Sequence, residues 1–165
     1  MDENEPKYQS IIHTPVGTFV AKFDEKYLIS FKIEESEKDL PHKESGLTVL
    51  LKNELAKYFK GELKVFKIPI NPQGTEFQKS VWQQLQNVPF GKTATYKTIA
   101  DNLSNPSARA VGNANGENPI WVIIPCHRII GSDGTLTGYA GGLSVKESLL
   151  KLEGAQLACF QPTLF

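Results

Sequence analysis

The segment of this sequence that says most about its architecture runs from Thr95 to Gly116 and reads TYKTIADNLSNPSARAVGNANG. Thr95 is a good helix N-cap, and the residues that follow it predict a short helix, Tyr96 to Leu103. Asn105-Pro106 predicts a turn, and a second short helix follows from Ser107 to Asn115. Two short helices joined by a tight turn are typical of a helix-turn-helix, a pattern that ordinary helical hairpins share.

The second of these helices has small side chains along most of its length. It carries Ala108, Ala110, Gly112 and Ala114, and Arg109 is its only long charged side chain. Such a helix packs tightly inside a domain or approaches another surface closely, and its composition alone favours neither. If that surface is DNA, the minor groove becomes accessible, and Arg109 is the natural side chain to insert between bases.

Composition sets the class of protein. The chain has 165 residues, is 40% hydrophobic and has a formal net charge of zero, which suits one good core or two small ones. This charge balance argues against a strongly basic nucleic-acid binder, yet between Gln78 and Gly116 four basic side chains accompany one acidic side chain. Solvated surfaces also produce such local surpluses. There is no apolar run of about 18 residues and no signal-peptide pattern, so we expect a soluble, cytoplasmic protein.

Several site classes are excluded. The two cysteines, Cys126 and Cys159, cannot build a disulfide framework or a four-cysteine zinc site. His13, His42 and His127 stand apart from one another, and the chain has no phosphate-binding loop or dinucleotide fingerprint. We therefore expect no metal and no nucleotide cofactor.

The first third of the chain predicts a small antiparallel sheet covered by a helix. Strands are predicted over Tyr8–Thr14, Thr18–Phe23 and Tyr27–Ile33. A helix follows from Leu47 to Phe59, ended by Gly61, and the alternating segment Val65–Ile70 predicts a further strand. We place the domain boundary after it, with one domain over residues 1–71 and a second over residues 72–165.

In the second half, the apolar run Ile120-Trp121-Val122-Ile123-Ile124 leads into Pro125-Cys126-His127-Arg128 and predicts a buried strand that ends at a thiol. A cysteine in this place is either a small core residue or a nucleophile. Neighbouring residues on a strand point to opposite faces, so His127 assists Cys126 only if the backbone turns there or a water bridges them.

Ser144 and Glu147 have capping-box spacing and predict the start of a last helix, which ends near Gly154. Glu153 lies at the unfavourable, negative end of its dipole. It is either a solvated charge or the partner of His127 in a relay of Glu153, His127, a water and Cys126, in which the carboxylate holds the imidazole tautomer.

A series of motifs then occurs in order between Thr75 and Gly154. They are Phe77-Gln78, Val81-Trp82, Pro89-Phe90-Gly91, Thr95-Tyr96, Arg109-Ala110-Val111-Gly112, Asn118-Pro119, Pro125-Cys126-His127-Arg128, Gly138-Tyr139-Ala140-Gly141-Gly142-Leu143 and Lys146-Glu147. This series resembles the O6-alkylguanine-DNA alkyltransferases; residues 1–70 match only in general layout. The resemblance implies an α+β fold, with a ribonuclease-H-like sheet-plus-helix domain followed by a mostly helical, winged-helix-like domain with the helix-turn-helix.

The resemblance also implies an activity. A monomer without cofactors would bind duplex DNA in the minor groove, rotate an O6-alkylated guanine out of the stack and transfer the alkyl group irreversibly to Cys126. O6-Methylguanine would be the main substrate, with O4-methylthymine as a second one. Such a suicidal methyltransferase acts in the cytoplasm at the nucleoid, or in the nucleus of a eukaryote.

The same resemblance assigns roles to residues. Cys126 would be the nucleophile, with His127 and Glu153 as its base relay, Tyr96 as the phenol on guanine N3, and Asn118 as the amide that organises the turn. Arg109 would fill the vacated stack, and Thr95, Ala110 and Gly112 would complete the DNA-binding surface. The substrate pocket would consist of Trp121, Ile129, Tyr139, Ala140, Gly141 and Lys146, with Arg128 in a structural role.

Two residues depart from the family pattern. Ala140 stands where some members carry a serine that contacts the lesion oxygen, and Trp121 stands where others have a smaller residue. We therefore expect a preference for methyl over benzyl adducts. The amino-terminal zinc ligands of some members are absent, so no zinc is expected.

Three other functions compete with this one. They are a non-catalytic sensor of alkylated DNA, a thiol hydrolase with a Cys/His pair, and a DNA-binding module with an inert cysteine. The presence of Cys126 argues against the sensor. Cys159 is interpreted as an incidental thiol in the tail.

Overall fold

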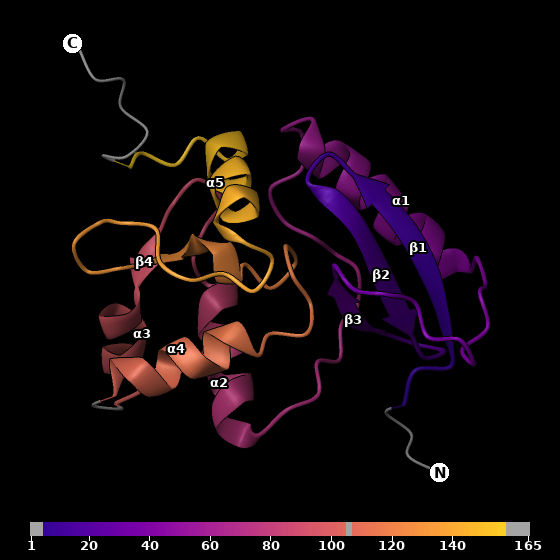
Figure 1. The fold of residues 1–165 in the computed structure, drawn as a ribbon, viewed down its shortest axis with the longest axis horizontal. Coiled ribbons are helices and arrows are strands. Elements are labelled where there is room, and N and C mark those ends of the chain that lie inside the picture. The colour runs from indigo at the N-terminus through magenta and orange to yellow at the C-terminus, as the bar shows by residue number, and fades with distance from the viewer. Residues whose placement is uncertain (1–4, 105–106, 158–165) are drawn as a thin grey trace. The chain divides into compact units, whose positions relative to one another are not determined.

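A computed structural model describes residues 5–104 and 107–157 (Figure 1). The chain forms two compact units, which are described separately. The first contains the residues up to Thr75 together with Pro119–Ile123, and the second contains Glu76–Asn118 and the residues from Ile124 onward. The architecture is α+β, as predicted. The predicted turn Asn105-Pro106 and Cys159 lie outside the described residues.

The first unit is built on an antiparallel sheet in the order β1-β2-β3. Its strands are β1 (Tyr8–Thr14), β2 (Gly17–Phe23) and β3 (Leu28–Lys32). Helix α1 (Gly46–Phe59) packs against β1 (Figure 1). The side chain of Ser45 caps α1 and forms a capping box with Thr48. The sheet and this helix confirm the sequence prediction.

The predicted strand over Val65–Ile70 is wrong. Only Ile70 forms a bridge, to Leu28, and Val65 is 72% exposed. The reason is a buried carboxylate on α1, because Glu54 accepts hydrogen bonds from the backbone N–H groups of Lys67 (2.7 Å) and Ile68 (2.8 Å). These two donors bind a side chain instead of a neighbouring strand.

The apolar run at 120–124 also departs from its prediction as a strand. Ile120 forms a single bridge to Phe31, and the chain then turns, with the N–H of Ile123 donating to the carbonyl of Trp121 at 2.8 Å. Val122 has φ 72°, which a β-branched residue rarely adopts. The indole of Trp121 packs edge-on against Phe19, so this run completes the core of the first unit.

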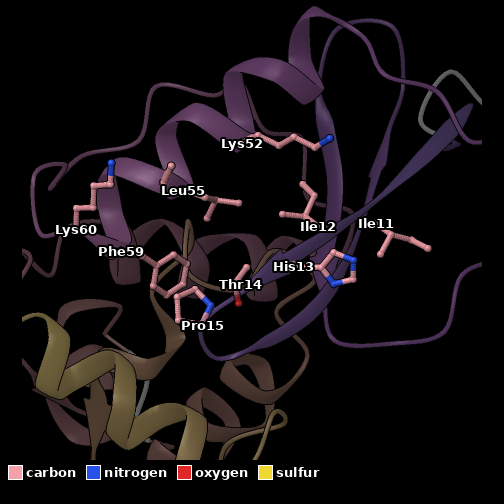
Figure 2. A pocket seen from close by; sticks show the side chains of 10 residues that line it. Ile11, Ile12, His13, Thr14, Pro15, Lys52, Leu55, Phe59 and Lys60 are labelled. Atoms are coloured by element: carbon pink, nitrogen blue, oxygen red, sulfur yellow. The ribbon is translucent and has the colours of Figure 1, made fainter.

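A pocket of about 540 Å³ lies in the first unit between β1 and α1 (Figure 2). Ile12 from β1 faces Leu55 from α1 across it, and Phe59 closes one end. Lys52 and Lys60 line it as well, and Lys52 is paired with Glu44 at 2.7 Å.

The second unit is mostly helical. Its helices are α2 (Glu76–Gln86), α3 (Tyr96–Asn102), α4 (Ala108–Gly116) and α5 (Leu143–Leu152). Two short strands, β4 (Ala94–Thr95) and β5 (Ile129–Ile130), pair in parallel. The indole N–H of Trp82 on α2 donates to the carbonyl of Ala114 on α4 at 2.8 Å.

The two-helix segment forms as predicted, within a residue at most ends. Thr95 caps α3 by accepting from the N–H of Thr98 (3.1 Å), and Ser107 caps α4 by accepting from the N–H of Ala110 (3.0 Å). The capping box predicted at Ser144 and Glu147 is wrong. Helix α5 begins at Leu143, and its N-cap is Gly142, with φ 95° and no side-chain cap.

Within residues 5–104 and 107–157, no helix has the length and apolar character that crossing a bilayer requires. The same residues contain no cluster of three or more His, Cys, Asp or Glu side chains able to hold a metal ion.

Candidate active site

Cys126 begins a single turn of 3-10 helix, Cys126–Arg128, that leads directly into β5. Its N–H donates to the carbonyl of Ile124 at 2.8 Å. The amide of Asn118 donates to the same carbonyl at 2.9 Å, and the amide of Asn115 donates to the carbonyl of Cys126 at 3.4 Å. Two asparagines from the C-terminal end of α4 and just beyond it therefore hold the turn that carries the thiol. No sequence pattern predicted this role for Asn115, because it looks like any residue that precedes a helix-ending glycine.

Cys126 is 2% exposed. Burial raises its pKa, while hydrogen bonds from the side chains of Asn118 and Tyr139 and the charge of Lys146 oppose that rise. Each of these groups favours the thiolate over the thiol. The site therefore contains the elements that would stabilise a nucleophilic sulfur once its proton is removed.

His127 and Arg128 both bind Glu153, the C-cap residue of α5. The Nε2 atom of His127 lies 2.7 Å from the carboxylate, and the Nε and Nη2 atoms of Arg128 donate to it at 2.8 and 3.0 Å. Arg128 also donates to the carbonyl of Val88 at 2.7 Å. The Glu153 side chain is fully buried, so the unfavourable position at the helix end is offset by a guanidinium and an imidazole.

This geometry fixes the tautomer of His127. A carboxylate only accepts, so Nε2 carries the hydrogen, and Nδ1 keeps a lone pair that no described residue binds. Burial, together with the charges of Arg128 and Lys146, lowers the pKa of His127 although Glu153 raises it, so the imidazole is neutral near pH 7. For Glu153, burial raises the pKa, but His127 and Arg128 together lower it to about 2. The pair is a neutral base held by an ionised carboxylate.

Lys146 on α5 is fully buried and donates to the carbonyl of Thr137 at 2.8 Å. No described carboxylate lies within ion-pair distance of it. Burial lowers its pKa to about 8, and the negative charge of the Cys126 thiolate acts in the opposite direction. A buried ammonium without a carboxylate partner is costly, so the thiolate is the anion that this lysine is placed to stabilise.

Tyr96 begins α3 and is half-buried. Its hydroxyl accepts a hydrogen bond from the hydroxyl of Thr137 at 3.1 Å. Its ring lies beside Gly112 of α4, since a Cβ built on that glycine would be 3.6 Å from the ring. The small residue at this position brings α4 close to the tyrosine.

Arg109 is exposed in the first turn of α4 and makes no hydrogen bond or ion pair with any described residue. Ala110 and Gly112 follow it and are half-buried, and Thr95 is occupied as the cap of α3. The helix therefore presents one long cation beside small side chains.

The remaining predicted pocket residues come from several parts of the chain. Ile129 is buried, and its N–H already donates to the carbonyl of Cys126. Tyr139 is half-buried near the thiol, Ala140 is exposed and Gly141 is half-buried in the loop before α5. Trp121 belongs to the first unit, where it packs against Phe19.

Comparisons with known proteins agree with this geometry. Residues 76–155 match the family model described as 6-O-methylguanine DNA methyltransferase, DNA binding domain. A methylated-DNA–protein-cysteine methyltransferase of Methanosarcina acetivorans is 47% identical over 156 residues, which cover 90% of this chain and 99% of that protein. One of Haemophilus influenzae is 44% identical over 154 residues, with coverage of 88% and 86%.

A solved structure gives the same result. The crystal structure of Mycobacterium tuberculosis OGT in complex with DNA matches with a TM-score of 0.83 and 38% sequence identity, covering 89% of this chain and 92% of that one. The identity and the coverage together confirm the resemblance drawn from the motifs. The chain belongs to the methylated-DNA–protein-cysteine methyltransferase family, the O6-alkylguanine-DNA alkyltransferases.

Proposed function

We propose that this protein repairs DNA by moving the alkyl group of an O6-alkylguanine onto the sulfur of Cys126. The observation that carries the proposal is a buried thiol with a fully buried ammonium, Lys146, acting on it, in the same unit as the exposed Arg109 of a helix-turn-helix. Duplex DNA that contains the lesion is the partner.

The chemistry is an in-line displacement. The bond between Sγ of Cys126 and the alkyl carbon forms as the bond between that carbon and O6 breaks. The thiol proton passes through a water to Nδ1 of His127, whose Nε2–H remains bonded to Glu153. The departing guanine takes up one proton from solvent and His127 releases the thiol proton to solvent, so the overall products are an S-alkylcysteine and an unmodified guanine.

The reaction occurs once per molecule. A thioether has no good leaving group, and the described site offers no second nucleophile to remove the alkyl carbon. Lys146 stabilises the thiolate before transfer, and Asn118 keeps the turn at Ile124 in place. The protein is therefore a stoichiometric methyl acceptor.

DNA binding is proposed for the α3–α4 segment in the minor groove. The slim α4 approaches the groove, and Arg109 enters the stack as the damaged base leaves it. Tyr96 donates to N3 of the rotated guanine. Thr95, Ala110 and Gly112 contribute the close surface around it.

The pocket favours a methyl adduct over a benzyl adduct in this proposal. Ala140 supplies no hydroxyl to the lesion oxygen, and Tyr139 and Lys146 both act on the thiol of Cys126. Equal rates of Cys126 alkylation from the two adducts, or faster benzyl transfer, would contradict this preference.

Residues 1–71 are proposed to support the acceptor domain, 72–165, without contributing a reacting group. The protein acts as a monomer in the compartment that holds the DNA, in the cytoplasm at the nucleoid or in a nucleus.

The test is intact mass before and after exposure to a duplex carrying O6-methylguanine, with Cys126→Ala as the control. We expect a gain of one methyl group per protein, with a plateau at one lesion repaired per molecule and no gain in the variant. Continued turnover without a plateau would favour a thiol hydrolase. No mass gain in the unmodified protein would make the cysteine inert and the protein a sensor or a simple DNA-binding module.

A further inference from the structure

We propose that Thr137 is a positioning residue for this reaction and that its hydroxyl orients the phenol of Tyr96 toward the departing base. Thr137 lies in the loop between β5 and α5 and touches the site from two sides. Its hydroxyl donates to the phenol oxygen of Tyr96 at 3.1 Å, and its carbonyl accepts from Lys146 at 2.8 Å. One residue therefore links the phenol to the ammonium that acts on Cys126. The inference rests on the proposed function.

In the hydrogen bond between Thr137 and Tyr96, the choice of donor decides whether the phenol hydrogen can bind the substrate. A phenol has one hydrogen and accepts through its oxygen. Because Thr137 donates, Tyr96 accepts, and its own hydrogen is not used by any described residue. That hydrogen is left to point at an acceptor on the substrate. A phenol that accepts a hydrogen bond is also a stronger donor, since hydrogen bonds in a chain polarise one another.

The shape of threonine suits this task. Its second Cβ substituent restricts χ1, and its methyl group lies against Gly131, where an added Cβ would be 3.3 Å away. The methyl contact and the restricted rotamer hold the hydroxyl on the side of Tyr96. Gly112 backs the tyrosine ring from α4. The phenol is thus held by its ring on one element and by its oxygen on another.

Two substitutions separate the hydroxyl from the rest of the side chain. Thr137→Val keeps the branched shape and the carbonyl that binds Lys146 but removes the donor. Thr137→Ser keeps the donor. Thr135→Val is the matched control in the same loop, because its hydroxyl binds Asp133 at 2.7 Å instead of Tyr96.

The measurement is the rate of methyl transfer from an O6-methylguanine duplex at saturating protein, followed by intact mass. We expect Thr137→Val to slow transfer about fivefold to tenfold, the factor for one lost neutral hydrogen bond. Thr135→Val should stay within about twofold of the unmodified protein, and Thr137→Ser, which keeps the donor but loses the methyl contact, should slow transfer less than Thr137→Val. In a Tyr96→Phe background, Thr137→Val should add less than about twofold, because the two groups act as a pair.

A second readout does not depend on transfer. With ¹³Cζ-labelled tyrosine, the resonance assigned by its loss in Tyr96→Phe should shift in Thr137→Val and stay in place in Thr137→Ser and Thr135→Val. Normal transfer by Thr137→Val, an equal loss in Thr135→Val, or full additivity with Tyr96→Phe would overturn the proposal. If the unmodified protein transfers no methyl group while the resonance still shifts in Thr137→Val, the proposed function fails and the hydrogen-bond link alone survives.

Discussion

Replacing Glu153 with glutamine tests whether the buried carboxylate is what holds the active-site turn together. The substitution keeps the size of the side chain but removes its charge and one acceptor. In the structure the carboxylate accepts from Nε2 of His127 at 2.7 Å and from two guanidinium nitrogens of Arg128 at 2.8 and 3.0 Å. An amide group would turn an N–H donor toward these donors. The one oxygen that glutamine keeps cannot serve all of these donors, so Arg128, only 6% exposed, would lose at least part of its bidentate bond and keep the carbonyl of Val88.

Two lines of reasoning give the same loss in free energy of unfolding for Glu153→Gln. The displacement of the pKa of Glu153 from 4.5 to about 2 corresponds to about 3 kcal/mol. Removing one partner of a buried ion pair typically costs about 3 to 5 kcal/mol. We therefore expect Glu153→Gln to lower the free energy of unfolding by about 3 kcal/mol at pH 7.

The pH dependence follows from the direction of the shift. A carboxyl whose pKa is lower in the folded state contributes its full stability above its unfolded pKa, 4.5, and loses it as the pH falls toward about 2. The difference between the unmodified protein and Glu153→Gln should therefore be constant from pH 7 to about 5 and shrink below that.

The assay is urea denaturation at several pH values. The control is Glu147→Gln on the same helix, because Glu147 pairs with Lys151 at 2.8 Å but both side chains are exposed. That variant should change the free energy of unfolding by less than about 0.5 kcal/mol. A Glu153→Gln variant as stable as the Glu147→Gln control at pH 7, or a loss that persists undiminished in acid, would refute the reasoning.

Three further predictions concern single side chains. Gly91→Ala should destabilise the fold by about 1 to 3 kcal/mol, measured by thermal denaturation. The backbone φ of Gly91 is 81°, and the new Cβ would lie 2.9 Å from the carbonyl oxygen of Glu153. Unchanged stability would contradict this prediction. Lys146→Met removes a cation that lowers the pKa of Cys126, so the pH of half-maximal alkylation should rise. An unmoved profile would exclude an electrostatic role for Lys146. Arg109→Ala should slow methyl transfer from a duplex about tenfold or more, because the duplex requires base flipping. It should leave transfer from the free base O6-methylguanine unchanged. Equal slowing with both substrates would show that Arg109 acts in the transfer step itself.

The sequence predicted elements whose causes are local. The strand-forming residues of β1, the helical spacing in α1 and the N-cap Thr95 act within a few residues of one another, and these elements form where they were expected. The strand predicted over 65–70 is wrong because two of its backbone donors bind the side chain of Glu54 on the preceding helix, 13 and 14 positions away. The strand predicted over 120–124 is wrong because a run of apolar residues indicates burial and does not specify the backbone conformation.

The residues of the site also divide into those with a local sequence signal and those without one. Cys126 and His127 stand together in the sequence, and the pairing of His127 with Glu153 was proposed from the unfavourable charge at a helix end. The bidentate bond from Arg128 to the same carboxylate joins residues 25 positions apart and had no local signal. Thr137 had no local signal either, because a threonine in a glycine-rich loop looks like an ordinary loop residue until its bonds to Tyr96 and Lys146 are known.

The path of the chain just before the nucleophile limits how the protein can be divided. Pro119–Ile123 belong to the first unit, where Ile120 bridges Phe31 and Trp121 packs on Phe19, whereas Asn118 and Ile124 belong to the second. A fragment that starts at Glu76 would leave that indole in water, a few residues ahead of the reactive sulfur. Truncation, circular permutation or fusion designs must therefore retain the amino-terminal sheet for the methyl acceptor to survive.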